Sequence, residues 1–532
     1  MQHRTIAFDT HHFEGALTEA LVESGELAPQ SLTQHQELAL RFADYYSHLC
    51  RLPRRARRAL QRQWKRSLAT IALLLALGQA PALAATIAVA PGTPPPINPD
   101  GRCSLIEAME NANGGAIHAD CVAGAAGADI ITLPAGSTQS LTEAHNADNG
   151  LPVVASRITI QGNDSTITGI PASLGGYVRI LAVGASGNLT VNDCTITGGD
   201  MYFGGGGGIA NFGGTLTLNS STVSDNGGVG ILNEGTLTLN KSTVSNNGAF
   251  YYGGVENRGT MTMTDSAVSD NSARFVGGVV NAGSLTLTDS SISGNSVSRY
   301  VGGLDNRGTA TLINSTVSKN TAYGYPYAYD GSAGGVENSG TLVLTNSTVS
   351  GNLGNQPVAF DAPGAGGIKN GKTLIVTHST ISGNQSTSSD PSTRGGGGGI
   401  TNAGKLVLKR TLVSGNSGPE AAEMLHDSGS LTVNKFNLLG HSGDSGVVGF
   451  IPGAKDIVPT QALNQILGPL ANNGGATNTH ALVAASPALD AVDAGCPPPA
   501  TDQRGERRPR DGDGDGTALL RHRRLRAHAG GI

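Results

Sequence analysis

Acidic side chains recur at similar positions along the middle of this 532-residue chain, namely Glu234, Glu256, Asp305 and Glu337. Clustered carboxylates are what a glycoside hydrolase needs for acid–base chemistry, and a polysaccharide lyase needs Ca²⁺-binding acids with a basic residue. In other copies of the surrounding sequence, the position of Glu256 is held by Ala210, Leu232, Val280, Lys369 and Thr401. The sequence therefore imposes no catalytic geometry, and we expect these acids to lie on a solvated surface.

Aromatic residues make up only 4% of the chain, yet they collect in its variable loops. They are Phe250, Tyr251, Tyr252, Phe275, Tyr300, Tyr323, Tyr325, Tyr327 and Tyr329. Exposed rings suit contacts with sugars or with proteins. The alternative is that the rings pack the loops against the body of the fold. These loops are the best candidate for a ligand-binding surface.

Metal and histidine chemistry has weaker support. Asp511, Asp513 and Asp515 alternate with glycine as in the first half of a Ca²⁺ loop, but His522 stands where the loop needs a Glu. A flexible acidic linker is the alternative, and no other cofactor is expected. His378 stands where other copies have Asn or Asp, which favours a surface role.

A repeated phrase positions most of these residues, from about Gly204 to Asn416. Its form is Gly-Gly-(Ile/Val)-x-Asn-x-Gly-Thr-Leu-Thr-Leu-x-x-Ser-Thr-Val-Ser-x-Asn. Its first Asn is Asn211, Asn233, Asn257, Asn281, Asn306, Asn338, Asn370 and Asn402, and its second is Asn226, Asn247, Asn271, Asn295, Asn320, Asn352, Asn384 and Asn416. The two lie 14 or 15 residues apart, whereas the next copy begins its Asn 7 to 18 residues later. A fixed part alternating with an elastic part is typical of a solenoid.

The fixed part reads as strands, because Leu237-Thr238-Leu239 and its equivalents place apolar residues at i and i+2. Gly-Thr and Asn-x-Gly supply the turns between them. We expect a parallel β-helix over residues 155–440. Equivalent Asn side chains would then stack about 4.8 Å apart and hydrogen-bond along two columns. The alternative is that each Asn only adopts a turn conformation with positive φ.

Composition and charge exclude some functions. Gly accounts for 77 residues, which suits tight corners rather than a large globular core. Residues 67–503 carry 17 Lys or Arg against 29 Asp or Glu, a net charge of −12. Nucleic-acid binding is disfavoured, because it requires a basic face.

A secretory signal is predicted at residues 54–84. A basic run from Arg54 to Arg66 precedes an apolar segment, Leu68 to Leu77, and an Ala82-Leu83-Ala84 cleavage site. The segment is short for a transmembrane helix, and an uncleaved anchor is the alternative. Residues 1–53 are either an N-terminal extension or the product of a start assigned too early.

Export makes disulfides permissible. Cys103 and Cys121 lie 18 residues apart and flank one short segment, so we expect them to be paired beside a helix at about Ser104–Asn113. Cys194 lies in a strand pattern as a small core residue, and Cys496 is left without a partner.

The segment from Cys103-Ser104-Leu105-Ile106-Glu107-Ala108 to Leu133-Pro134-Ala135-Gly136 resembles the CSLREA motif that opens many bacterial β-helix surface proteins, with Ile106 replacing an Arg. The Gly-Gly-Val/Ile repeats are similar, more weakly, to those of polymorphic outer-membrane proteins. The stretch Leu467–Leu482, with Ser486–Asp490 and Asp502-Gln503-Arg504-Gly505, resembles the choice-of-anchor Q domain. Together the resemblances cover about residues 85–517. They imply a pectin-lyase-like fold, that is, a right-handed parallel β-helix, and export, but no defined activity.

The expected organisation follows. Residues 85–154 form a small helical, disulfide-bonded N-terminal cap with the first strands, 155–440 the β-helix, and 441–517 the anchor-Q-like region, in which His480 makes a structural hydrogen bond. We expect an exported protein, located extracellularly, on the cell surface or in the outer membrane of a bacterium. Its function would be adhesion, scaffolding or the binding of a surface glycan or protein, with no catalytic residues. The alternative is a carbohydrate-active β-helix enzyme.

The end of the chain departs from the anchor-Q pattern. Such domains commonly end in a Cys-Asp-Ile-Gly-Ala-Tyr-Glu-like phrase, whereas residues 518–532 form an Arg- and His-rich tail. Leu519 to Arg526 can be encoded so that a shift of one base reads Cys-Cys-Asp-Ile-Gly-Ala-Tyr. We therefore expect a frameshifted, functionless tail and a free Cys496, which sequencing of the gene would test.

Overall fold

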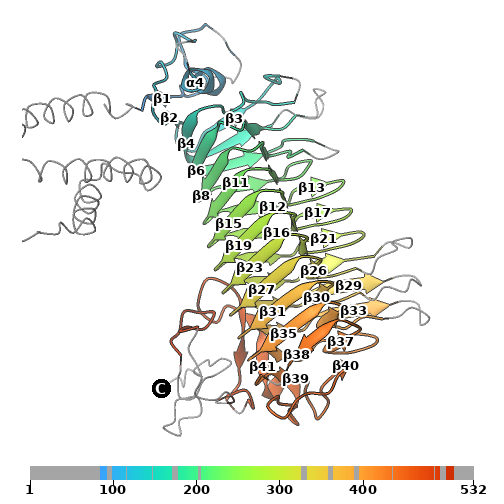
Figure 1. The fold of residues 1–532 in the computed structure, drawn as a ribbon. Coiled ribbons are helices and arrows are strands. Elements are labelled where there is room, and N and C mark those ends of the chain that lie inside the picture. The colour runs from blue at the N-terminus through green and yellow to red at the C-terminus, as the bar shows by residue number, and fades with distance from the viewer. Residues whose placement is uncertain are drawn as a thin grey trace, which may run out of the picture. The chain divides into compact units, whose positions relative to one another are not determined.

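The repeats form a right-handed parallel β-helix, seen in a computed structural model (Figure 1). The model describes residues 84–92, 97, 99–114, 117–146, 148–169, 178–201, 205–324, 332–356, 364–388, 395–433, 435–484, 486–489, 491 and 499–508. The predicted N-terminal extension, all of the predicted signal except Ala84, Cys496, Asp511, Asp513, Asp515 and the 518–532 tail lie outside the described residues. So do Tyr325, Tyr327 and Tyr329.

Each repeat contributes one coil, which contains up to four short strands. A long strand with the Thr-Leu-Thr-Leu pattern leads into a short strand with the Thr-Val-Ser pattern. A loop strand follows in some coils, and an Asn strand that ends on the first Asn completes the coil. Equivalent strands of successive coils pair in parallel, so that Thr236 lies opposite Thr260 and Asn233 opposite Asn257.

The long and short strands together make one 23-stranded sheet. The first strands of the sheet are β1 (Thr86–Ala88), β2 (Asp129–Thr132), β3 (Thr138–Ser140), β4 (Arg157–Thr168) and β6 (Asn188–Thr197). The long strands are β8 (Thr215–Asn219), β11 (Thr236–Asn240), β15 (Thr260–Thr264), β19 (Ser284–Thr288), β23 (Thr309–Ile313), β27 (Thr341–Thr345), β31 (Thr373–Thr377), β35 (Lys405–Lys409) and β38 (Ser430–Thr432). The short strands are β9 (Thr222–Ser224), β12 (Thr243–Ser245), β16 (Ala267–Ser269), β20 (Ser291–Ser293), β24 (Thr316–Ser318), β28 (Thr348–Ser350), β32 (Thr380–Ser382), β36 (Leu412–Val413) and β39 (Leu438–Leu439).

Two further parallel sheets complete the coils. The Asn strands and their end neighbours are β5 (Leu181–Val183), β7 (Ile209–Asn211), β10 (Ile231–Asn233), β14 (Val255–Asn257), β18 (Val279–Asn281), β22 (Leu304–Asn306), β26 (Val336–Asn338), β30 (Ile368–Asn370), β34 (Ile400–Asn402), β37 (Met424–His426) and β40 (Val447–Val448). The loop strands are β13 (Gly248–Ala249), β17 (Ser272–Ala273), β21 (Ser296–Val297), β25 (Thr321–Ala322), β29 (Leu353–Gln356) and β33 (Gln385–Ser388).

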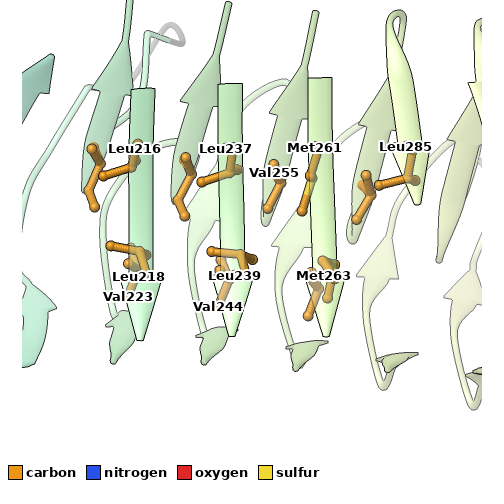
Figure 2. Close-up of a cluster of buried hydrophobic side chains, with 14 of the residues drawn as sticks. Leu216, Leu218, Val223, Leu237, Leu239, Val244, Val255, Met261, Met263 and Leu285 are labelled. Carbon is orange, nitrogen blue, oxygen red and sulfur yellow. The ribbon is translucent and has the colours of Figure 1, made fainter. Parts of the chain in front are cut away.

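The core is a file of aliphatic side chains inside the coils. Along a long strand such as β11, Leu237 and Leu239 are buried while the threonines between them point outward. Figure 2 shows the same inward positions in successive coils, each side chain stacked on its equivalent. Burying one such Leu or Val stabilises the fold by about 1.5–3 kcal/mol, so each coil depends on its neighbours to cover its apolar interior.

Both predicted Asn columns are confirmed as hydrogen-bonded ladders. In the second column, the Asn271 side-chain amide donates to Asn295 Oδ1 at 2.9 Å, and Asn271 Oδ1 accepts from the Asn247 amide at 2.9 Å. The first column repeats this pattern from Asn211 to Asn402, with bonds of 2.6–2.8 Å. The turn alternative is wrong, because no ladder Asn has positive φ. Turn residues such as Asp265 and Asn346 adopt it instead.

The N-terminal cap also matches the prediction. Helix α4 (Leu105–Ala112) begins after Ser104, whose side chain accepts from the Glu107 backbone while Glu107 returns a bond to the Ser104 backbone. Cys103 and Cys121 form a disulfide, and Cys194 is a buried free thiol. Among the described residues there is no helix that combines the length and hydropathy needed to cross a membrane.

After the last coils the chain folds back onto earlier ones. A 3₁₀ turn, η3 (Leu463–Gln465), leads into an antiparallel pair, β41 (Leu467–Ala471) and β42 (Thr479–Leu482). Residues 466–508, which we call the C-terminal segment, lie against the outer face of the short strands β24 and β28 (Figure 1). Gln503 joins two coils, because its amide donates to Thr316 Oγ1 at 2.9 Å and its carbonyl accepts from Thr348 Oγ1 at 2.8 Å.

Candidate functional site

Aromatic side chains from three successive coils form a stacked file on the outside of the β-helix. The Tyr251 and Phe275 rings stack with centroids 5.6 Å apart, and Phe275 and Tyr300 stack at 5.4 Å. Each ring lies in the loop that precedes the Gly-Gly pair of its coil, so the parallel register of the coils aligns the rings. The file exists because the loops grew at equivalent positions in successive coils.

The rings pack against the solenoid without being covered by it. Val276, Val280, Val301 and Ala333 form a small apolar cluster outside the main core, and Tyr252, Phe275 and Tyr300 pack onto it. The guanidinium groups of Arg274 and Arg299 lie over the Phe275 ring. Tyr251 nevertheless stays 39% exposed. Packing and availability for binding, which the sequence presents as alternatives, therefore coexist.

A groove with a volume of about 430 Å³ runs beside this file. Its aromatic wall is Tyr251, Tyr252, Phe275 and Tyr300, and its polar wall is Asp305, Arg307, Glu337 and Ser339. We call these residues the aromatic groove. An apolar wall facing a few converging polar groups is the usual composition of a small-ligand site.

The polar wall is held by ion pairs. Arg307 Nη2 donates to Asp305 Oδ2 at 2.6 Å and its Nε donates to the same oxygen at 2.9 Å. Lys369 Nζ lies 3.1 Å from Glu337 Oε1. The hydrogen bond to Asp305 is the main cause that raises the pKa of Arg307, and Tyr252 adds to it. The guanidinium therefore keeps its charge beside the rings.

The expectation that the acids are solvated is wrong for two of them. Glu256 and Asp305 are only 8% and 6% exposed, because each carboxylate folds against the Arg two residues later. Arg258 also bridges to Glu234, in the preceding coil, at 2.8 Å. The pattern acid–Asn–Arg places the acid and the Arg on the outer side of a strand end while the Asn points inward, and this spacing was a signal in the sequence.

Structure brings together two acids that the sequence separates by 32 residues. Asp305 of β22 pairs in direct register with Glu337 of β26, so their backbones are about 4.8 Å apart. Both side chains line the aromatic groove. Glu256 is two coils away from Asp305, with Val280 between them in register, and does not line the groove.

The other candidate residues lie elsewhere. Tyr323 follows β25, is 58% exposed and is not part of the groove. His378 has positive φ in the turn after β31 and is 6% exposed, so the predicted surface role is wrong. His480 makes the predicted structural contacts, with Nε2 2.8 Å from Ser350 Oγ and Nδ1 2.7 Å from the Gly468 carbonyl.

Sequence reasoning missed the groups that terminate the Asn columns. Asn402 of the first column lies 2.9 Å from His426 Nδ1. The second column ends on Glu423, which accepts from the Asn416 side chain at 2.6 Å and from the Gly415 backbone at 2.7 Å. Burial raises the pKa of Glu423 to about 7, although these hydrogen bonds lower it in part. Met424 pairs with Ile400, so aligning Glu423-Met424-Leu425-His426 with the repeat would have found both residues.

A third column was also missed. The backbone N–H of each serine after a long strand donates to the serine Oγ of the next coil, at 3.1–3.2 Å. The column runs through Ser221, Ser242, Ser266, Ser290, Ser315, Ser347 and Ser379. The Ser of Ser-Thr-Val-Ser is therefore a structural residue.

Comparison with known proteins adds no assignment to this geometry. Within the described ranges, no three His, Cys, Asp or Glu side chains come together in a way that could hold a metal ion. No family model matches the chain, and no curated protein and no solved structure is significantly similar to it. The right-handed parallel β-helix with its stacked Asn columns is thus the closest description that the molecule supports.

Proposed function

We propose that this protein is exported to the surface of a bacterium and binds a glycan in the aromatic groove. The stacked file of Tyr251, Phe275 and Tyr300 beside the groove is the observation that carries the proposal. The apolar C–H faces of a sugar ring stack on aromatic rings, and its hydroxyls bind carboxylates and guanidinium groups. Asp305, Arg307 and Glu337 stand opposite the rings in this way.

Export rests on the sequence. The basic run, the apolar segment and Ala82-Leu83-Ala84 support a signal peptide, and the disulfide in the cap suits an oxidising compartment. The resemblances to the CSLREA motif and the choice-of-anchor Q domain support a surface protein. The cap carries the first of these motifs, and His480 and Gln503 of the second are buried against the β-helix.

A panel of polysaccharides, tested for retention of the full chain, examines glycan binding. Tyr300→Ala should weaken binding by about tenfold, the loss expected for about 1.4 kcal/mol. Tyr323→Ala is the matched control, because that ring is exposed but outside the groove, and it should leave binding unchanged. Equal weakening by both variants, or retention by no polysaccharide, would contradict the proposal.

Glycan hydrolysis is a second candidate, favoured by the direct register of Asp305 and Glu337 in the groove. Two carboxylates about 5 Å apart can act as acid and nucleophile on one glycosidic bond. Release of reducing ends from a bound polysaccharide would be lost in Asp305→Asn and in Glu337→Gln but kept in Glu256→Gln. If no reducing ends appear while Glu337→Gln weakens retention, the groove binds without cleaving.

A further inference from the structure

The outer face of five long strands carries a regular array of hydroxyl groups. Strands β8, β11, β15, β19 and β23 each place a Thr or Ser at their first and third positions, and these side chains point away from the core. The array is Thr215, Thr217, Thr236, Thr238, Thr260, Thr262, Ser284, Thr286, Thr309 and Thr311. We call this array the hydroxyl face.

Strand register makes the hydroxyl face periodic in two directions. Thr217, Thr238 and Thr262 are direct partners in successive coils, as are Thr215, Thr236 and Thr260. Because the register is maintained without a bulge through β19 and β23, each column repeats every strand spacing of about 4.8 Å. Along one strand the two hydroxyl residues are separated by about 6.6 Å.

The ten hydroxyls are left for solvent. Among the described residues, none of their side chains makes a hydrogen bond to another protein group, whereas the backbone groups beside them are paired in the sheet. Thr260 and Thr236 are exposed, and Thr238 and Thr262 are half-buried by their neighbours. Each Thr therefore presents one methyl group and one free hydroxyl to water at a fixed position.

The face has no charge. Its strands carry neither acidic nor basic residues, and the nearest charged side chains lie in the turns, such as Lys241 and Asp265. It has no aromatic ring either, unlike the aromatic groove. Nucleic acids require cations, and stable protein interfaces are enriched in aromatic residues, so both are poor partners for this surface.

We propose that the hydroxyl face binds ice. A surface that repeats in two dimensions matches a partner that repeats in two dimensions, and water molecules on the faces of hexagonal ice repeat at distances close to those of the array. A neutral crystal also matches the absence of charge. Water held over the methyl and hydroxyl columns would be ordered in the arrangement of the ice lattice and would join the growing crystal.

The array ends within the molecule. In β27 and β31 the middle column changes to Val343 and Ile375, and β35 places Lys405 and Lys409 on the same face. The C-terminal segment lies against the neighbouring short strands at about the same coils. The hydroxyl face is thus the uncovered part of this sheet, and it is separate from the aromatic groove.

Thermal hysteresis and the coarsening of ice grains measure this activity for the full chain. We expect the full chain to depress the freezing point below the melting point, to shape ice crystals and to keep grains small. Thr262→Lys should lose most of this activity, because a long charged side chain lifts the face from the lattice. Thr238→Lys repeats the test on the neighbouring strand.

Ser272→Lys is the matched control. It makes the same chemical change in the coil of Thr262, at an exposed position on the loop strand β17, and should keep full activity. Melting temperatures show that the variants are folded. Absence of hysteresis and normal grain growth in the unaltered chain would overturn the proposal, as would equal losses from Thr262→Lys and Ser272→Lys. Binding to crystalline polysaccharide that Thr262→Lys abolishes, without an effect on ice, would assign the face to that polymer instead.

Discussion

The same short-strand sequence occurs in two regions of the β-helix with different surroundings. Thr243-Val244-Ser245 in β12 has two partly exposed hydroxyl residues around one buried Val. Thr348-Val349-Ser350 in β28 is buried throughout, because the C-terminal segment covers its outer face. The interior is the same in both regions, and only the outer face differs. The repeat therefore specifies a coil, whereas a distant segment decides which coils are free to bind something else.

The largest expected effect tests whether the interiors are equivalent. Asn271→Ala in an uncovered coil and Asn352→Ala in a covered one should each lower the free energy of unfolding by about 3–5 kcal/mol, because each leaves several buried groups without partners. Urea denaturation followed by circular dichroism measures both. A difference above about 1 kcal/mol would show that the cover also stabilises the interior.

A pH dependence should be confined to the last coils. The raised pKa of Glu423, about 7, exceeds the value of about 4.3 for an exposed Glu, so between these values the folded state holds a proton that the unfolded state has released. Stability is therefore full below about pH 4.3 and falls as the pH rises through 7, by about 3 kcal/mol at most.

Hydrogen exchange of the Gly415 and Asn416 amides at pH 5 and pH 8 detects this change, after correction for intrinsic exchange rates. Glu423→Gln should remove the pH dependence while the amides of β12 behave alike in both proteins. The same pH dependence in the variant would contradict the assignment to Glu423.

Removing the contact between cover and coil should have a moderate effect. Gln503→Ala loses the bonds to Thr316 and Thr348 and should cost about 1–2 kcal/mol. Limited proteolysis within residues 466–508 should become faster. Gln461→Ala, which changes a partly exposed residue near the same segment, is the control and should leave the cleavage rate unchanged.

The smallest effect compares one hydroxyl in the two regions. Ser350→Ala should cost about 1 kcal/mol, because it leaves His480 Nε2 without this partner, 2.8 Å away. Ser245→Ala should change the free energy of unfolding by less than about 0.5 kcal/mol, since its side chain faces water. Equal costs in thermal or urea unfolding would mean that the cover does not depend on this contact.

Much of the fold was predictable because it is local and repeated. The alternation of Leu and Thr, the two Asn and the Ser104–Glu107 capping pattern all act within a few residues or one coil. Hydrogen bonds of the Asn side chains follow once the coils stack. The burial of Glu256 and Asp305 was not predicted, since a carboxylate beside an Arg reads equally well as solvated or paired.

The candidate site was predictable only in part. The aromatic loops are evident in the sequence, but the groove needs Asp305, Arg307 and Glu337 from strand ends in two coils. Glu423 was overlooked because its repeat copy has lost the Gly-Gly pair and the Asn, so the sequence pattern weakens where the ladder ends.

The sequence by itself determined the coil: its strands, its apolar interior, its Asn columns and its disulfide-bonded cap, because those interactions recur at fixed spacing. Only the tertiary structure decided which outer faces meet other parts of the chain. Gln503 reaches Thr316 across 187 residues, and Asp305 meets Glu337 through strand register. Such contacts depend on how many residues each loop contains and where the chain turns back, and no local spacing encodes them.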